Sequence, residues 1–205
     1  MRAKRENKRA VTLTTPDLVL LSLLAERPMH GYQANLELER RQARDWAGIS
    51  RPQVYYSLEK LAGLGLLRGI DTAEPAEGPE RSVYATTAKG RSALAAALAR
   101  EDWTTQRDRP AFLAWLALSW QAPPKTVRSQ IQRRRKFLQS EIAREEETLR
   151  SVLAEVGHPY HEAVWMLNLV IQQFKLEVRW LCKVEREYPR RARAKHPDYV
   201  REDSA

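Results

Sequence analysis

The chain has few of the residues from which metal and redox sites are built. Its 205 residues include a single cysteine, Cys182, and four histidines. One thiol cannot form a disulfide within the chain, and it argues against a zinc cluster. We therefore expect a protein of a reducing compartment that works without a metal ion or other cofactor.

Long apolar segments are also missing. No run of about 18 apolar residues occurs, and the basic start, MRAKRENKRA, is not followed by the apolar core of a signal peptide. We expect a cytoplasmic protein, and we exclude a membrane as its partner. The net charge of +9 favours a polyanionic partner such as nucleic acid, although many basic soluble proteins bind none.

Motifs typical of enzymes are the third absence. The sequence has no nucleophile motif, phosphate-binding loop or pair of carboxylates in a suitable setting, so we expect no enzymatic activity. The run Glu145–Glu147 and the basic run 133–136 are most simply the solvated faces of a helix. His158 and His161 flank Pro159 and are interpreted as loop residues.

The first half of the chain predicts three helices and a hairpin. The apolar segment LVLLSLLAE follows a cap at Thr15, and a second helix begins at His30-Gly31-Tyr32. The third helix is predicted over residues 50–67, with a buried stripe formed by Val54, Leu58, Leu61 and Leu64. Extended runs at 66–72 and 81–86 flank a turn-rich segment, and Thr87 caps the helix that follows.

The second half predicts helices only. A short helix begins at Arg109-Pro110, a long one covers 126–156, and a last one follows Pro159 and ends at Pro189. The two long helices have heptad-like apolar seams and should form an antiparallel hairpin. A two-fold dimer would cover their remaining apolar surface, the alternative being a monomer whose helices close on the first domain.

These elements predict a mainly α protein, with an N-terminal winged helix-turn-helix, a small β-hairpin wing and an all-α C-terminal dimerisation domain. The expected segments are a basic flexible arm (1–14), a winged-helix domain (15–105), a helical dimerisation and effector domain (109–188) and a disordered tail (189–205).

In a winged helix, the third helix lies in the major groove of DNA with its N-terminal residues toward the bases. Once the stripe is assigned to the core, the residues expected to face outward are Arg51, Gln53, Tyr56, Ser57 and Lys60. Arg51 could bind guanine and Gln53 adenine, while the hydroxyls of Tyr56 and Ser57 could reach phosphates. Any solvated helix face carries such polar residues, but the large aromatic Tyr56 favours a functional surface.

Three motifs occur in order over residues 16–98: LVLLSLLAERPMHGYQ, SRPQVYYSLEKLAGLGLL and GPERSVYATTAKGRSAL. Together they resemble the PadR-like transcriptional regulators, in the branch with a longer helical C-terminal domain. The resemblance implies a DNA-binding winged helix, a helical part that dimerises, and repression relieved by a small molecule. It assigns the tyrosine positions of the family to Tyr32 and Tyr55, which would contact phosphate or pack at the groove edge. It also assigns a basic wing position to Arg81 before Tyr84, and a motif position to Ser50.

This chain departs from the family pattern at two places. It has Pro52-Gln53 where many members have a small Gly-Thr pair, and Tyr56 where proline is frequent. The operator sequence of the family is therefore not transferable to this chain.

Five tryptophans lie outside the predicted DNA-reading core, and a planar aromatic effector could stack between such rings. They are Trp103, Trp115, Trp120, Trp165 and Trp180. Core packing is the alternative for each ring.

We therefore expect a bacterial, nucleoid-associated homodimer that binds a palindromic operator in double-stranded DNA and represses transcription. The alternative is a dimeric winged-helix module that binds protein instead of DNA. An RNA-binding module is a third possibility, with less support because neither an RNP-like strand pair nor a GXXG loop is present.

Overall fold

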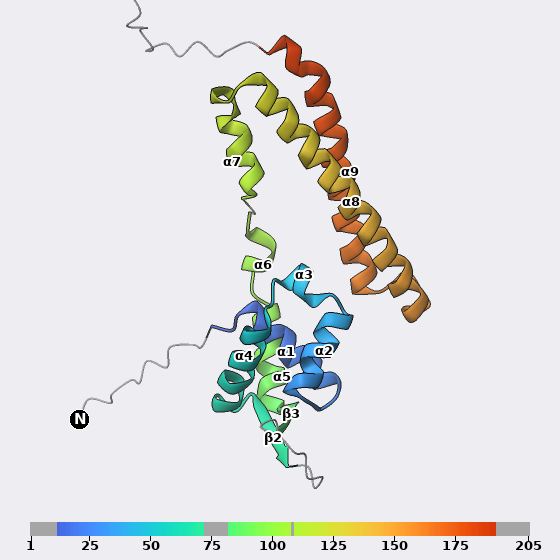
Figure 1. Ribbon diagram of the computed structural model, residues 1–205. Coiled ribbons are helices and arrows are strands. Elements are labelled where there is room, and N and C mark those ends of the chain that lie inside the picture. Colours follow the sequence, from blue (N-terminus) through green and yellow to red (C-terminus); the bar gives the residue numbers. More distant parts are fainter. Residues whose placement is uncertain (1–11, 72–81, 108, 192–205) are drawn as a thin grey trace, which may run out of the picture. The chain divides into compact units, whose positions relative to one another are not determined.

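The computed structural model describes residues 12–71, 82–107 and 109–191. The chain divides into two compact units, the first ending at Arg107 and the second beginning at Asp108, and each is described separately (Figure 1). None of the helices in the described ranges is long and apolar enough to cross a membrane.

The first unit consists of six helices and three short strands in its described part. In chain order they are α1 (Thr15–Glu26), β1 (Met29–His30), α2 (Gly31–Arg40), α3 (Ala43–Ala47), α4 (Arg51–Gly63), β2 (Leu67–Asp71), β3 (Ser82–Thr86), α5 (Ala88–Leu98) and α6 (Asp102–Thr105). The predicted order of helices and strands is confirmed, but the short helices α3 and α6 were not predicted.

The third predicted helix is shorter than the sequence suggested. It begins at Arg51 but ends at Gly63, so the prediction of a helix through residue 67 is wrong. Gly65 has a φ of +69°, a left-handed conformation that glycine adopts without strain. The Leu66 N–H then donates to the Leu61 carbonyl at 2.9 Å, and Leu67 begins β2.

The sheet has three strands instead of the predicted two. Strands β2 and β3 are antiparallel, and Met29 and His30 of β1 pair with Tyr84 and Val83 on the other side of β3. A strand of two residues has no sequence period of its own, which is why the pattern missed it. The turn-rich segment 72–81, including Arg81, lies outside the described residues.

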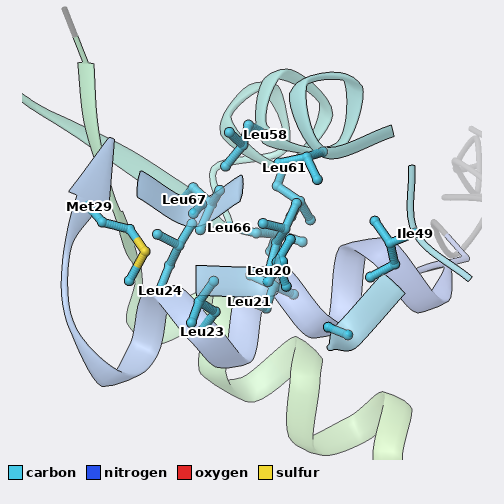
Figure 2. Packing of buried hydrophobic residues seen from close by; sticks show 14 residues of the cluster. Leu20, Leu21, Leu23, Leu24, Met29, Ile49, Leu58, Leu61, Leu66 and Leu67 are labelled. Atoms are coloured by element: carbon cyan, nitrogen blue, oxygen red, sulfur yellow. The ribbon is translucent and has the colours of Figure 1, made fainter. Parts of the chain in front are cut away.

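The core of the first unit lies between α1, α4 and the sheet. Figure 2 shows Leu61 of α4 directed toward Leu20 of α1, and Leu58 of α4 and Leu21 of α1 belong to the same cluster. All four side chains are almost completely buried, as is Val54. The predicted stripe of the third helix is thus confirmed, with Leu64 packed against the edge of this cluster.

A buried carboxylate joins the start of α1 to α4. Asp17 is fully buried, and its Oδ2 accepts hydrogen bonds from the Thr14 N–H at 2.7 Å and the Lys60 Nζ at 2.6 Å. Burial acts to raise the pKa of Asp17, but hydrogen bonds from Lys60, Thr14 and Ser57 outweigh it, so the pKa lies below its ordinary value. The carboxylate is therefore ionised in the folded chain at neutral pH.

A second cluster of charges holds the end of α2. The carboxylate of Glu37 accepts hydrogen bonds from Arg40 Nη2 at 2.7 Å and from Arg41 Nε at 2.8 Å. The hydrogen bond from Arg40 is the largest of the effects that lower the pKa of Glu37 to about 2. Arg41 also pairs with Glu26, which ties the end of α2 to the end of α1.

The second unit contains a helical hairpin. Its described elements are α7 (Ala111–Leu118), a 3-10 turn η1 (Ser119–Gln121), α8 (Pro124–Val156), α9 (Glu162–Glu187) and a 3-10 turn η2 (Tyr188–Arg190). Pro189 lies within η2, and residues 192–205 of the predicted tail are outside the described ranges.

The predicted apolar seams of the two long helices form the contact between α8 and α9. Val127, Ile131 and Leu138 of α8 are buried with Leu181 of α9 in one cluster. Ion pairs Arg134–Glu177 and Arg135–Glu185 connect the two helices at 2.8 and 2.5 Å. Gly157, with a φ of +79°, follows the last residue of α8, Val156, which is also the predicted end of the long helix.

The lowered pKa values predict a specific loss of stability in acid. Because Asp17 has a lower pKa in the folded than in the unfolded chain, its contribution is present above about pH 4 and is lost as the pH falls below that value. Glu37, with a pKa lowered to about 2, adds to this loss of stability as the pH falls below about 4. We expect Asp17→Asn to lower the free energy of unfolding at pH 7 by about 1 to 3 kcal/mol, since Lys60 then loses its carboxylate partner.

The measurement is urea denaturation between pH 2.5 and 7, with the wild type and Asp17→Asn side by side. The variant should lose less stability on acidification than the wild type. An acid slope equal to that of the wild type would contradict the assigned role of Asp17.

Candidate nucleic-acid interface

The outward face of α4 differs from the predicted one. The exposed residues are Arg51, Pro52, Gln53, Tyr55, Tyr56, Glu59 and Gly63. Tyr56 has 69% of its surface exposed, the largest fraction among the large hydrophobic residues of this helix. The helix therefore presents two adjacent tyrosines, as well as an acidic residue, Glu59, that the sequence argument overlooked.

Ser57 does not face outward. Only 2% of its surface is exposed, so its prediction as an outward phosphate contact is wrong. Lys60 is partly buried and bound to Asp17. The physical reason is the buried Asp17 carboxylate, which draws the polar side of α4 that carries Ser57 and Lys60 against the start of α1.

The first turn of α4 is held by a capping box. Ser50 is the N-cap residue, and Gln53 Oε1 accepts hydrogen bonds from the Ser50 N–H at 2.8 Å and the Ser50 Oγ at 2.9 Å. Bidentate contact with adenine requires both the oxygen and the nitrogen of the amide. Gln53 uses its oxygen in the cap, which leaves its Nε2 as the group that faces solvent.

Arg51 forms an ion pair with α2. Its Nη2 lies 2.9 Å from Glu39 Oε1, and the Arg44 Nε of α3 lies 3.7 Å from the same oxygen. The hydrogen bond from Arg51 is the main cause that lowers the pKa of Glu39. The residue predicted to read a base is thus already held by a carboxylate.

Two of the predicted tyrosines lie near the start of α2. A Cβ atom added at Gly31 would lie 3.2 Å from Cε1 of the Tyr55 ring and 3.1 Å from Leu58 Cδ1, so glycine allows this close approach of α2 and α4. Tyr32 follows directly and is mostly exposed. Tyr32 and Tyr55 therefore flank the residue at which the two helices approach each other.

The remaining predicted contacts are in or near the wing. Tyr84 of β3 is partly buried and packs against the core of the first unit. Arg81 lies outside the described residues, so its predicted role stays untested. Arg68 is an exposed cation on β2 that the sequence argument did not single out.

The five tryptophans do not form one site within either unit. Trp103 belongs to the first unit, where its indole N–H donates to the Ala97 carbonyl at 2.8 Å. In the second unit, Trp115 stacks on Phe112 beside the core, whereas Trp165 and Trp180 are exposed on α9. Trp120 is exposed and lines a hollow of about 310 Å³ together with Leu116, Ile131, Tyr188 and Arg191.

The histidines near the hairpin turn have structural roles. His158 Nδ1 accepts the Tyr160 N–H and His161 Nδ1 accepts the Ala163 N–H, each at 3.2 Å. Within the described ranges, no three His, Cys, Asp or Glu side chains come close enough to hold a metal ion.

Part of the first unit matches the sequence model of a known protein family. Residues 20–96 match the sequence model of the Transcriptional regulator PadR-like family, which confirms the resemblance found in the motifs. No curated protein sequence matches the chain.

Solved structures of PadR and of PadR-like regulators are similar to this chain over most of its length. Bacillus subtilis PadR in complex with operator DNA has a TM-score of 0.72 at 16% identity, covering 85% of this chain and 98% of that chain. The same protein in complex with p-coumaric acid has a TM-score of 0.72 at 15% identity, covering 85% and 99%. A PadR-like transcriptional regulator from Bacillus cereus has a TM-score of 0.61 at 20% identity, covering 87% and 98%. At these identities the likeness shows the fold, a winged helix followed by a helical region.

Proposed function

We propose that this chain, which carries a PadR-like domain in residues 20–96, is a cytoplasmic, sequence-specific DNA-binding regulator. It binds a palindromic operator as a homodimer and represses transcription until a small molecule binds. The observation that carries the proposal is the exposed face of α4, where two tyrosines and an arginine are not used by the core.

The proposed contacts follow from the position of each side chain on α4. Arg51, in the first turn, reads guanine through its N–H groups, while Tyr56 and Tyr55 donate hydroxyl hydrogen bonds to phosphates. Tyr32 contributes from the start of α2. Ser57 and Lys60 take no part, because Asp17 holds that side of the helix.

The charges on the exposed face of α4 favour recognition of bases over general electrostatic attraction to the phosphate backbone. The positive charge of Arg51 is matched by two exposed acids, Glu39 and Glu59. Affinity for the phosphate backbone must therefore come mainly from cations elsewhere, such as Arg68 and, as predicted, Arg81. Glu59 can accept a hydrogen bond from the amino group of cytosine.

The near-neutral charge of the α4 face also favours the second candidate, a module that binds protein through the same tyrosines. The two functions differ in their response to salt. Binding of DNA releases counterions and weakens steeply with salt concentration, whereas binding of a protein to a neutral surface does not.

The DNA proposal predicts the effects of two substitutions on α4. Tyr56→Ala should weaken operator binding by about 1 kcal/mol through loss of a phosphate contact. Arg51→Ala should cost about 1 to 3 kcal/mol for the preferred sequence and relax the preference at one base position. Gel shifts with DNA upstream of the chain's own gene, at several salt concentrations, provide the measurement.

Tyr160→Ala is the matched control, because this tyrosine is exposed in the turn after α8. It should bind DNA like the wild type. Salt-independent binding, or wild-type affinity in both α4 variants, would exclude the DNA-reading role of this face.

The proposed dimer is supported by an exposed apolar stripe on α9. Trp165, Leu169, Leu176 and Trp180 are 40 to 61% exposed, on the side of the helix that does not pack against α8. Contiguous apolar surface of this kind is typical of an interface. Because a two-fold interface pairs one patch with its own copy, the stripe can cover itself.

The dimer proposal predicts that Leu169→Glu yields monomers. Two like charges would face each other across the two-fold axis, and burial of each would lack a partner. Gln139→Glu, an exposed position on α8 and not on the stripe, is the control and should remain dimeric. Sedimentation of the full chain measures both, and an unchanged dimer of Leu169→Glu would place the interface elsewhere.

We propose that the effector binds in the hollow beside Trp120. The residues that line this hollow include the apolar Leu116 and Ile131, one cation, Arg191, and one acid, Glu187. The apolar wall and Arg191 suit a small aromatic carboxylate, and the similar Bacillus subtilis protein has been solved with p-coumaric acid.

The effector proposal predicts that p-coumaric acid quenches the fluorescence of Trp120. The quench should be smaller in Trp120→Phe than in the wild type, while Trp165→Phe serves as the control and should keep it. An equal quench in the wild type and in Trp120→Phe would exclude this hollow as the binding place.

A further inference from the structure

An acidic residue lies at the very position where a DNA-reading surface would be expected to be basic. Glu39, near the end of α2, is 44% exposed and ion-paired to Arg51, which is 67% exposed. The pKa of Glu39 is lowered, chiefly by the hydrogen bond from Arg51, so the carboxylate is ionised at neutral pH. A negative charge here opposes the approach of phosphates and needs an explanation.

The stability of the fold does not explain why an acidic residue is present at position 39. An ion pair between two exposed side chains contributes little to the stability of a fold, because water screens it and ordering two long side chains costs entropy. The end of α2 is already held by the cluster of Glu37, Arg40 and Arg41. The Glu39–Arg51 pair is thus of little use for folding but lies at the first residue of α4.

The geometry leaves Arg51 able to bind a second partner. Glu39 Oε1 contacts one nitrogen, Nη2, of a guanidinium group that has five N–H donors in a planar fork. A long arginine side chain loses rotamer entropy when it is ordered, and the ion pair orders part of the Arg51 side chain beforehand. The Nε of Arg44 lies 3.7 Å from the same oxygen of Glu39, so a second cation also holds this carboxylate.

We propose that Glu39 is a positioning residue that holds Arg51 for base recognition and thereby raises sequence specificity. The inference rests on the proposed DNA-binding function. Glu39 keeps the guanidinium at the front of α4 and away from neighbouring phosphates, which the carboxylate repels. Specificity increases because the negative charge of Glu39 holds Arg51 for its contact with a base and disfavours contacts with phosphates, which carry no sequence information.

The experiment measures affinity for two duplexes. The first is the sequence that the wild-type chain enriches from a randomised duplex pool, and the second differs from it at the base pair at which Arg51→Ala loses its preference. The ratio of the two dissociation constants is the discrimination. It is measured for the wild type, Glu39→Ala, Arg51→Ala and the double variant.

We expect Glu39→Ala to reduce the discrimination about fivefold, a part of the range of one bidentate base contact. Glu39→Gln keeps a hydrogen-bond acceptor for Arg51 without the negative charge, and it should retain part of the discrimination between the two duplexes. In the Arg51→Ala background, removal of Glu39 should leave the discrimination unchanged, because its effect passes through Arg51.

Glu26→Ala is the matched control, because Glu26 is also an exposed partner of an arginine, Arg41, but lies at the end of α1. It should leave the discrimination as in the wild type. Thermal denaturation of every variant verifies that the chain remains folded.

The outcomes separate the inference from the function on which it rests. If Glu39→Ala tightens binding to both duplexes equally, with or without Arg51, Glu39 only repels DNA and the inference is wrong. If the wild-type chain enriches no sequence from the pool, the proposed function itself fails.

Discussion

The buried contact between Asp17 and Lys60 is the constraint on which the candidate interface depends. It connects the first turn of α1 to the third turn of α4 across 43 residues of sequence. A carboxylate without exposure to solvent is costly unless it is paired, and here Thr14 and Lys60 both donate to its Oδ2. Because the contact involves one side of α4, it determines which side of the helix remains for a partner.

Local signals in the sequence were sufficient for most of the elements. Thr87 caps its helix as expected, α8 ends at the predicted residue, 156, and the heptad-like apolar seams around Ile131 and Leu181 form the contact between α8 and α9. Each of these features depends on neighbours within a few residues, or on a repeated period. Patterns of that kind are visible in a single sequence.

The rotation of α4 could not be predicted in the same way. Helix periodicity allowed Ser57 and Lys60 to be solvent-facing, because both lie beside the apolar stripe instead of within it. Their burial depends on Asp17, a polar residue that no apolar pattern marks as part of the core. Glu59, one turn beyond Tyr56, was not among the residues expected to face outward, and the Glu39–Arg51 pair joins two helices and leaves no periodic pattern in the sequence.

The central claim is that the exposed side of α4 marked by Tyr56 faces DNA. A chelated iron ion, attached through Tyr56→Cys in a Cys182→Ser background, tests it by cleaving the DNA strands near this position. The account predicts cleavage within each half of the enriched duplex, and none from the same chelate at Ser22→Cys on the exposed side of α1. Equal cleavage from both positions, or none from position 56 in a chain that still binds the duplex, would contradict it.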